Sequence, residues 1–480
     1  MSDVKEETLS GLKWRSIESL SVKGIQFVIG LVMARLLLPS DYGAVAMLSV
    51  FFAFSKCFID SGFNNALVRK LDRTETDFST VFYFNVVVAV IMYGVLFLIA
   101  PWVGDFFNMP ILCPILRVQA VELILNSFVT VQVARLTIAI DFKALAMRSA
   151  TSSLISGGLG IAFAYSGYGV WALVWQGIAA TFVRVVFICA YCRWKPLWVF
   201  SWQSFRELFS YGGKLLLSRL INQIYAKSTT LIIGKFFSPE DLGFYSKSTS
   251  LARYPSTTIK DVLRSVTFPV LVKLQNDDAH LIRVYRKYIS MSSMCIFFGC
   301  VLLAALARPL ILFLLTDKWA ASIIYLHIYC FGIMFDHLGG INLNLLQVKG
   351  RSDLYLRLEV FKKTLGMGIL LAAVPFGVLG ICISKVIWAQ VALAVNTYYT
   401  GKLFGMGYWT QMRDWSGFFI KAVLACAPAY MITLLPIPHL AMILLGGGVS
   451  VLLYYIMVRR NESFKEAAAI FVEKIKKKQK

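Results

Sequence analysis

Basic and hydroxyl side chains recur at helical spacing within an otherwise apolar part of the sequence. In residues 242–266 successive polar side chains lie three or four residues apart: Lys247, Ser250, Arg253, Thr257, Lys260 and Arg264. Such steps place side chains on one face of an α-helix. Ammonium and guanidinium groups suit phosphate and carboxylate oxygens, and a guanidinium can bind two of them at once. The stretch therefore indicates a face that binds an anion.

Two further stretches carry polar faces of the same kind. Residues 214–237 contain Arg219 and Lys227, and residues 14–34 contain Lys23, each with Ser, Thr or Gln at helical spacing. We predict a cavity whose basic side chains bind an anionic substrate: Lys23, Lys56, Arg219, Lys227, Lys247, Arg253 and Lys260. Ion pairing with an acid on a neighbouring helix is the alternative role for each of them. Four acids inside apolar windows are candidates for coupling to an ion gradient: Glu18, Asp60, Glu122 and Asp336.

The composition is that of an integral membrane protein. Of the 480 residues, 58% are hydrophobic and 15% are charged, whereas soluble domains are typically about 45–50% apolar and about 25% charged. Apolar runs such as residues 81–100 and 441–458 can cross a bilayer as helices, because about 20 residues span a hydrocarbon core of roughly 30 Å. Their hydrophobicity is continuous rather than alternating, which excludes membrane-spanning strands.

Fourteen apolar windows predict about fourteen transmembrane helices, and thus an all-α integral membrane protein. The windows are residues 14–34, 42–62, 79–100, 115–135, 146–166, 168–190, 214–237, 242–266, 288–307, 322–347, 357–375, 378–400, 416–435 and 439–458. Alternate loops are rich in Lys and Arg, whereas the opposite loops hold only Arg35, Lys235, Arg308 and Lys318. By the positive-inside rule both termini are cytoplasmic. The formal net charge of +22 lies mainly in these loops, so it favours contact with a membrane surface over nucleic acid.

One short motif occurs twice and divides the chain. The segment PSDYG at 39–43 matches PEDLG at 239–243 in its Pro, Asp and Gly. Pro stops one helix, Asp can cap the next and Gly permits a tight approach, which we favour over direct substrate contact. The repeat predicts two six-helix lobes of the same orientation around a central cavity, an arrangement that commonly works by alternating access. The predicted divisions are residues 1–205 for the N-lobe, 206–402 for the C-lobe, 403–460 for two C-terminal helices and 461–480 for a basic cytoplasmic tail.

No constellation typical of catalysis occurs in the sequence. The four histidines are scattered, and there is no zinc-protease, nucleophile-elbow or phosphate-loop motif. We therefore predict that the chain is not an enzyme, has no metal site and uses no cofactor. The energy for transport would come from a transmembrane proton or sodium gradient.

Several segments resemble the bacterial polysaccharide exporters of the multidrug/oligosaccharidyl-lipid/polysaccharide flippase superfamily, in particular those of the colanic-acid and Wzx type. The segments are SGLKW (10–14), ARLLLPSDYG (34–43), DSGFNNALVRK (60–70), FYFN (82–85), GYGVWALV (167–174), FPVLVKLQNDD (268–278) and DKW (317–319). The resemblance implies a flippase with two lobes around a V-shaped cavity, in the bacterial cytoplasmic membrane. It would move undecaprenyl-pyrophosphate-linked repeat units of O-antigen, capsule or exopolysaccharide to the periplasmic leaflet. The implied partners are this lipid-linked oligosaccharide and other polysaccharide-assembly proteins.

Three other functions compete with this interpretation. A multidrug exporter of the same superfamily would share the fold, but such exporters carry mainly organic cations and usually have twelve helices. A membrane polysaccharide polymerase or ligase would generally have a large basic periplasmic loop, and the outer loops here are short. A structural scaffold would not need charged faces within the membrane.

Overall fold

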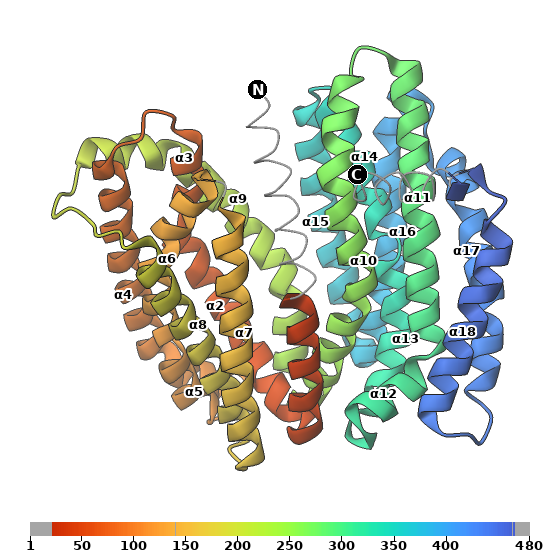
Figure 1. Cartoon of the computed structure of the whole chain (residues 1–480), viewed down its shortest axis with the longest axis horizontal. Coiled ribbons are helices and arrows are strands. Elements are labelled where there is room, and N and C mark those ends of the chain that lie inside the picture. Colours follow the sequence, from red (N-terminus) through yellow and green to blue (C-terminus); the bar gives the residue numbers. More distant parts are fainter. Residues whose placement is uncertain (1–21, 140, 463, 466–480) are drawn as a thin grey trace, which may run out of the picture. The chain divides into compact units, whose positions relative to one another are not determined.

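The structure, a computed structural model, describes residues 22–139, 141–462 and 464–465, which are helical apart from short connections (Figure 1). No strand occurs among these residues. A helix lies in the described part of every predicted window, so the all-α fold class is confirmed. Nine segments of the described chain are long and apolar enough to cross a membrane. The chain is thus a multi-pass membrane protein, and the total of fourteen crossings stays a prediction.

Two compact units make up the chain, Met1–Gly243 (unit 1) and Phe244–Lys480 (unit 2). The division falls within one long helix, α10 (Pro239–Lys273). This division does not test the predicted lobes, residues 1–205 and 206–402, which stay a prediction.

Unit 1 is a helical bundle with an apolar core. Its described helices are residues 22–36, α2 (Pro39–Asp60), α3 (Phe63–Arg69), α4 (Glu75–Phe106), α5 (Leu112–Gln119), α6 (Val121–Ile138), α7 (Phe142–Tyr165), α8 (Val170–Cys192) and α9 (Trp202–Phe236). The core between α3, α4, α6 and α9 includes Phe63, Leu67 and Val131, which are fully buried. Between helices in a membrane, such a core stabilises the bundle through close van der Waals packing.

The two copies of the Pro-x-Asp-x-Gly motif lie against each other within unit 1. The first copy begins α2 and the second begins α10. A Cβ atom on Gly43 would collide with the backbone carbonyl of Pro239, and one on Gly243 would collide with that of Pro39. Since only glycine lacks a Cβ atom, only glycine permits this contact. The repeat therefore builds a reciprocal backbone contact between the beginnings of α2 and α10.

The aspartates of the motif bond to the first turn of their helices. The Leu38 N–H donates to Asp41 Oδ2 at 2.9 Å. In the second copy the Asp241 N–H donates to Ser238 Oγ at 3.1 Å, and this hydroxyl donates to Asp241 Oδ2 at 2.8 Å. These bonds satisfy groups that a helix start leaves without partners. The motif is thus a helix boundary with a close contact, as the sequence predicts.

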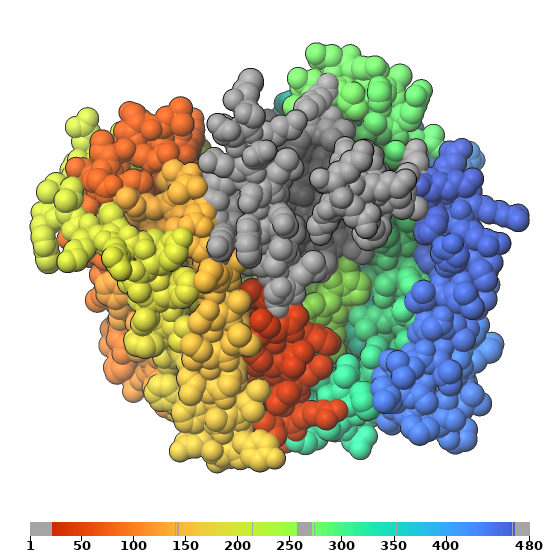
Figure 2. Space-filling view, viewed as in Figure 1, coloured from red at the N-terminus to blue at the C-terminus, as the bar shows by residue number. Residues whose placement is uncertain are grey.

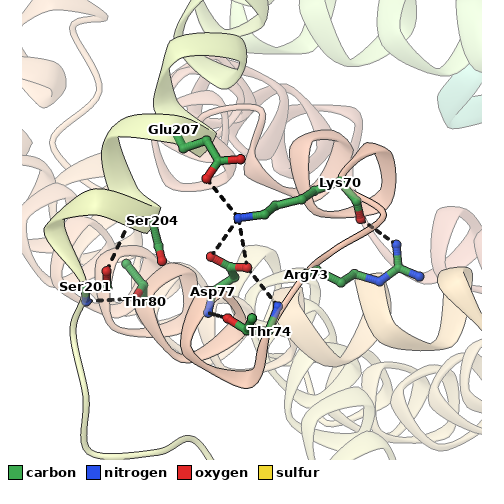
Figure 3. Close-up of polar contacts among 8 residues, drawn as sticks. All are labelled: Lys70, Arg73, Thr74, Asp77, Thr80, Ser201, Ser204 and Glu207. Atoms are coloured by element: carbon green, nitrogen blue, oxygen red, sulfur yellow. Dashed lines mark hydrogen bonds and ion pairs between the residues drawn. The ribbon is translucent and has the colours of Figure 1, made fainter.

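An ionic cluster ties the beginning of α9 to the beginning of α4 (Figure 3). The Lys70 ammonium lies 3.2 Å from Asp77 Oδ2 and 2.9 Å from Glu207 Oε2. Asp77 also accepts the Thr74 N–H at 2.8 Å, and Thr74 Oγ1 accepts the Asp77 N–H at 3.3 Å, which is a capping box. These polar bonds add to the apolar contacts of the start of α9, where Leu208 is buried in the core with α3, α4 and α6.

Unit 2 has the same all-helical construction. Its further helices are α11 (Asp278–Ala305), α12 (Ala307–Leu315), α13 (Ser322–Ile333), α14 (Asp336–Val348), α15 (Ser352–Ala373), α16 (Gly377–Phe404), α17 (Tyr408–Ile432) and α18 (His439–Val458), with short 3₁₀ turns at Asp317–Trp319 and Val374–Phe376. The last two helices pack within this unit, α17 against α11 and α18, and α18 against α12. They form a continuous strip of its surface (Figure 2). In α18, Leu444 and Leu452 are 66% and 59% exposed. Such a surface suits contact with lipid chains.

A buried polar network joins four helices of unit 2. Asn342 Oδ1 accepts hydrogen bonds from Tyr285 OH, Thr400 Oγ1 and Gln411 Nε2, each at 2.8 Å. All four side chains are fully buried. Because these residues belong to α11, α14, α16 and α17, the network fixes α17 to the rest of the unit. Satisfied networks of this kind define one arrangement of a core.

Candidate functional site

A cavity of about 690 Å³ lies in unit 1 between α2, α5, α6 and α9. Its lining combines apolar, neutral polar and charged side chains: Val45, Ser49, Phe52, Ala53, Lys56, Cys57, Asp60, Gln119, Glu122, Arg219, Asn222, Gln223 and Lys227. Five of these are residues that the sequence analysis selected, three as substrate-binding cations and two as acids. The structure therefore brings Lys56, Arg219 and Lys227 together with Asp60 and Glu122.

Arg219 and Asp60 form an ion pair at this cavity, in which Arg219 Nη1 donates to Asp60 Oδ2. The local backbone explains the contact. Ser61 and Gly62, directly after Asp60, have φ angles of 40° and 74°, and a Cβ atom on Gly62 would lie 2.6 Å from the Gly212 carbonyl oxygen. Glycine thus permits α2 to end against α9, two helical turns before Arg219. The alternative of internal pairing is realised for this arginine.

The other two cations of the cavity are held differently. Lys227 Nζ donates to Ser49 Oγ at 3.0 Å, a neutral partner. Lys56 is exposed and interacts electrostatically with Glu122. The lining of this cavity thus has three basic and two acidic side chains. The ammonium groups of Lys56 and Lys227 are of a kind that binds anions.

Glu122 is a buried carboxylate between α6 and α8. Its side chain is 8% exposed, and its Oε1 accepts a hydrogen bond from Gln119 Nε2 at 3.4 Å. A Cβ atom on Gly177 would lie 2.5 Å from the same oxygen, so glycine at this position of α8 makes room for the carboxylate. Arg184, also on α8, interacts with Glu122 electrostatically. A carboxylate at such a place within a membrane helix is a functional candidate by default.

Unit 2 contains a second group of charged side chains, on α10, α14 and α16. Arg253 Nη2 donates to Tyr329 OH at 3.4 Å. Asp336 and Lys385 both interact electrostatically with Arg253. The predicted substrate-binding Arg253 and the predicted coupling acid Asp336 are therefore neighbours within this unit, and Lys385 joins them.

The remaining predicted site residues lie elsewhere. Lys247 Nζ lies 5.9 Å from the centroid of the Trp319 ring in unit 2, within cation–π distance. Lys23 is partly buried in the helical residues 22–36 of unit 1 and is not among the residues that line the described cavity. Glu18 lies outside the described residues, as does the side chain of Lys260.

Sequence reasoning missed three polar participants. Gln119 and Ser49 line the cavity and bond to its charged groups, but an isolated Gln or Ser in an apolar window gives no signal beyond its polarity. Lys385 is a charged residue within the apolar window 378–400, but helical spacing within one window cannot connect it to Arg253 in another. Among the described residues, no three His, Cys, Asp or Glu side chains are grouped so that they could hold a metal ion.

Comparison with known proteins gives clear relatives. Residues 32–324, more than half of the chain, match the family described as Polysaccharide biosynthesis protein. The teichuronic acid biosynthesis protein TuaB of Bacillus subtilis (strain 168) is 24% identical over 404 residues, which cover 84% of this chain and 83% of TuaB. The lipopolysaccharide biosynthesis protein WzxC of Escherichia coli (strain K12) is 21% identical over 403 residues, 82% of this chain and 81% of WzxC. The resemblance noted in the sequence is thereby confirmed.

The fold is similar to that of a solved flippase. The lipid II flippase MurJ, in an inward closed conformation, superposes with a TM-score of 0.72 over 92% of this chain and 99% of MurJ. The two sequences are 12% identical, so the likeness concerns the fold alone.

Proposed function

The chain belongs to the Polysaccharide biosynthesis protein family, and on that premise we propose that it is a flippase for a lipid-linked oligosaccharide. It moves undecaprenyl-pyrophosphate-linked sugar repeat units from the cytoplasmic to the periplasmic leaflet of the bacterial cytoplasmic membrane. In this orientation both termini are cytoplasmic, as the basic loops favour. The chain acts as a transporter and not as an enzyme.

The polar cavity inside a bundle of apolar helices carries this proposal. A sugar head group and a pyrophosphate cannot cross hydrocarbon unaided, because neither can be desolvated cheaply. The cavity offers amide and hydroxyl groups from Ser49, Gln119 and Asn222, which suit sugar hydroxyls. Lys56, Arg219 and Lys227 suit the pyrophosphate. A lipid tail would stay in the bilayer while the head group uses the polar path.

Transport against a gradient needs an energy source, which we assign to a transmembrane proton or sodium gradient. Glu122 is the acid that fits this role best among the four candidates, because it is buried, borders the cavity and is charge-linked to Lys56 and Arg184. Neutralising a buried carboxylate by a cation changes its interactions with both neighbours. Such a change can favour one of two conformations over the other.

Replacing Gly177 by Ala tests this role of Glu122. The added methyl group would displace Glu122 Oε1, so we expect slower transport and an altered dependence on the ion gradient. Stability should change little, since the end of a flexible side chain can move. Gly158, on α7, has nothing within 4 Å of an added Cβ atom, and Gly158→Ala is the matched control. Equal transport by both variants would argue against Glu122 as the coupling group.

Export of surface polysaccharide in a strain without this gene tests the function itself. Complementation with the wild-type chain should restore export, whereas Arg219→Ala and Arg253→Ala should leave glycan lipid-linked on the cytoplasmic side at normal membrane abundance. Lys195, which is exposed in the connection before α9, provides the control Lys195→Ala. Normal export by both arginine variants would exclude these charges from substrate handling. Failure of the wild-type chain to restore any glycan export would exclude the function.

A further inference from the structure

The cavity arginine already has an anionic partner from its own chain. Arg219 Nη1 donates to Asp60 Oδ2, and both side chains are about one-third exposed, at 35% and 30%. A phosphate oxygen that enters the cavity therefore meets a guanidinium that Asp60 already engages. Arg219 Nη1 is thus a donor for which an incoming anion and Asp60 compete.

We propose that Asp60 is a built-in competitor for the anion site at Arg219. It engages the guanidinium while the cavity is empty and gives way to the diphosphate of the substrate. This inference rests on the proposed function and adds to it the residue that sets how tightly the anionic head group is held and how readily it leaves.

The bonding of Asp60 supports a displaceable partner. Its second oxygen, Oδ1, is buried and has no hydrogen-bond partner among the described residues, although a carboxylate can accept several hydrogen bonds. Asp60 is therefore held through Oδ2 alone. A diphosphate carries more charge and can engage the guanidinium through two oxygens at once, so it competes successfully at the same site.

The surrounding backbone keeps the two groups in place for repeated exchange. Asp60 ends α2, and the contact between Gly62 and Gly212 fixes this end against α9. In this proposal Asp60 leaves and returns by rotation of its own side chain, while the glycine contact holds the backbone of α2 and α9. The exchange is thus compatible with a rigid bundle.

Asp60 would act in two steps of a transport cycle, the release of the substrate and the return of the empty carrier. Release of the diphosphate is favoured because Asp60 returns to Arg219 and replaces the departing charge. The empty carrier is favoured because the arginine is not left uncompensated in a partly desolvated cavity, where an unpaired charge is costly. Without Asp60 the site would bind the anion more tightly and release it more slowly.

A double-mutant cycle on the purified full-length protein tests the competition. Binding of inorganic pyrophosphate is measured by calorimetry for wild type, Asp60→Asn, Arg219→Gln and the double variant, with sulfate at equal ionic strength as the reference anion. We expect Asp60→Asn to bind roughly two- to five-fold more tightly, as the loss of a partly exposed ion pair implies. Arg219→Gln should bind roughly tenfold more weakly or worse. Asp60→Asn should have no effect in the Arg219→Gln background.

Two results would overturn the proposal. One is unchanged or weaker binding by Asp60→Asn, provided that its melting temperature matches wild type; Asp60→Ser serves as the second variant if it does not. The other is that Asp60→Asn strengthens pyrophosphate binding equally in the wild-type and the Arg219→Gln backgrounds. Asp72, an exposed acid of unit 1, supplies the control Asp72→Asn, which should bind as wild type does.

The same variants in the complementation strain separate this inference from the proposed function. If wild type restores export and Asp60→Asn does not bind pyrophosphate more tightly, only the competitor role is lost. If wild type fails to restore export, the flippase function itself is lost. We expect Asp60→Asn to export at a lower rate in spite of its tighter binding, since release becomes slower.

Discussion

Replacing Gly43 or Gly243 by alanine should force apart the reciprocal contact between the beginnings of α2 and α10. Each added methyl group would overlap a backbone carbonyl, of Pro239 or Pro39, which cannot rotate away as a side chain could. Overpacking of this kind typically costs about 1–3 kcal/mol. The better helix propensity of alanine offsets up to about 1 kcal/mol of this. The net expectation is a loss of roughly 1–2 kcal/mol for each substitution.

Thermal unfolding of the purified protein in detergent measures this loss. Gly94, on α4, has nothing within 4 Å of an added Cβ atom, so Gly94→Ala is the matched control and should not lower the melting temperature. Gly43→Ala and Gly243→Ala should lower it by similar amounts, because the contact is reciprocal. The double variant should lose less than the sum, because both changes open one contact. Unfolding of both variants at the temperature of Gly94→Ala would refute the contact.

Two further predictions concern charged and polar clusters within each unit. Lys70→Met should destabilise the protein by roughly 2–4 kcal/mol, because it leaves the buried carboxylate of Asp77, 1% exposed, without its cation. Glu207→Gln should cost less than about 1 kcal/mol, since the side chain of Glu207 is 57% exposed. Burial lowers the pKa of Lys70, but its hydrogen bonds to Glu207 and Asp77 outweigh this effect and raise the pKa above its usual value. The stabilisation of the folded protein by the charged Lys70 should therefore be constant near neutral pH. It should decline only above about pH 10.4 in pH-dependent melting curves. Asn342→Ala removes the acceptor that three buried donors share. Thr400 and Gln411 keep Met406 O as an acceptor, so the main loss is the partner of Tyr285 OH, and we expect a cost of roughly 1–3 kcal/mol. A smaller loss than for Tyr285→Phe in the same melting assay would contradict the network.

Hydrophobicity and one repeat were enough to predict the fold class. Continuous apolar windows predict helices, because the hydrocarbon core of a bilayer offers the backbone no hydrogen-bond partners and a helix satisfies its backbone groups internally. The Pro-x-Asp-x-Gly repeat also predicted a close approach, and the structure provides it at Gly43 and Gly243. Helix lengths were less accessible: α9 and α10 each have 35 residues, since polar first and last turns continue a helix beyond the apolar window that reveals it.

The candidate site was predictable in its residue types and not in its pairings. Helical spacing shows which face of a helix is polar, and so it selected Arg219 and Lys227. It cannot show which residue of another helix lies opposite, because that depends on how the helices pack. Arg219 and Asp60 are 159 residues apart, and the glycine contact that joins their helices involves Gly62 and Gly212.

Translocation in proteoliposomes tests the central claim most directly. Purified full-length protein is reconstituted with a lipid-linked oligosaccharide isolated from the source cell and fluorescently labelled, and the share of head groups accessible to an added membrane-impermeant quencher is followed in time. Wild type should make head groups of both leaflets accessible well before protein-free vesicles do. Arg219→Gln, at equal incorporation and stability, should be at least several-fold slower. Wild-type rates equal to those of protein-free vesicles, with and without an ion gradient, would contradict the account.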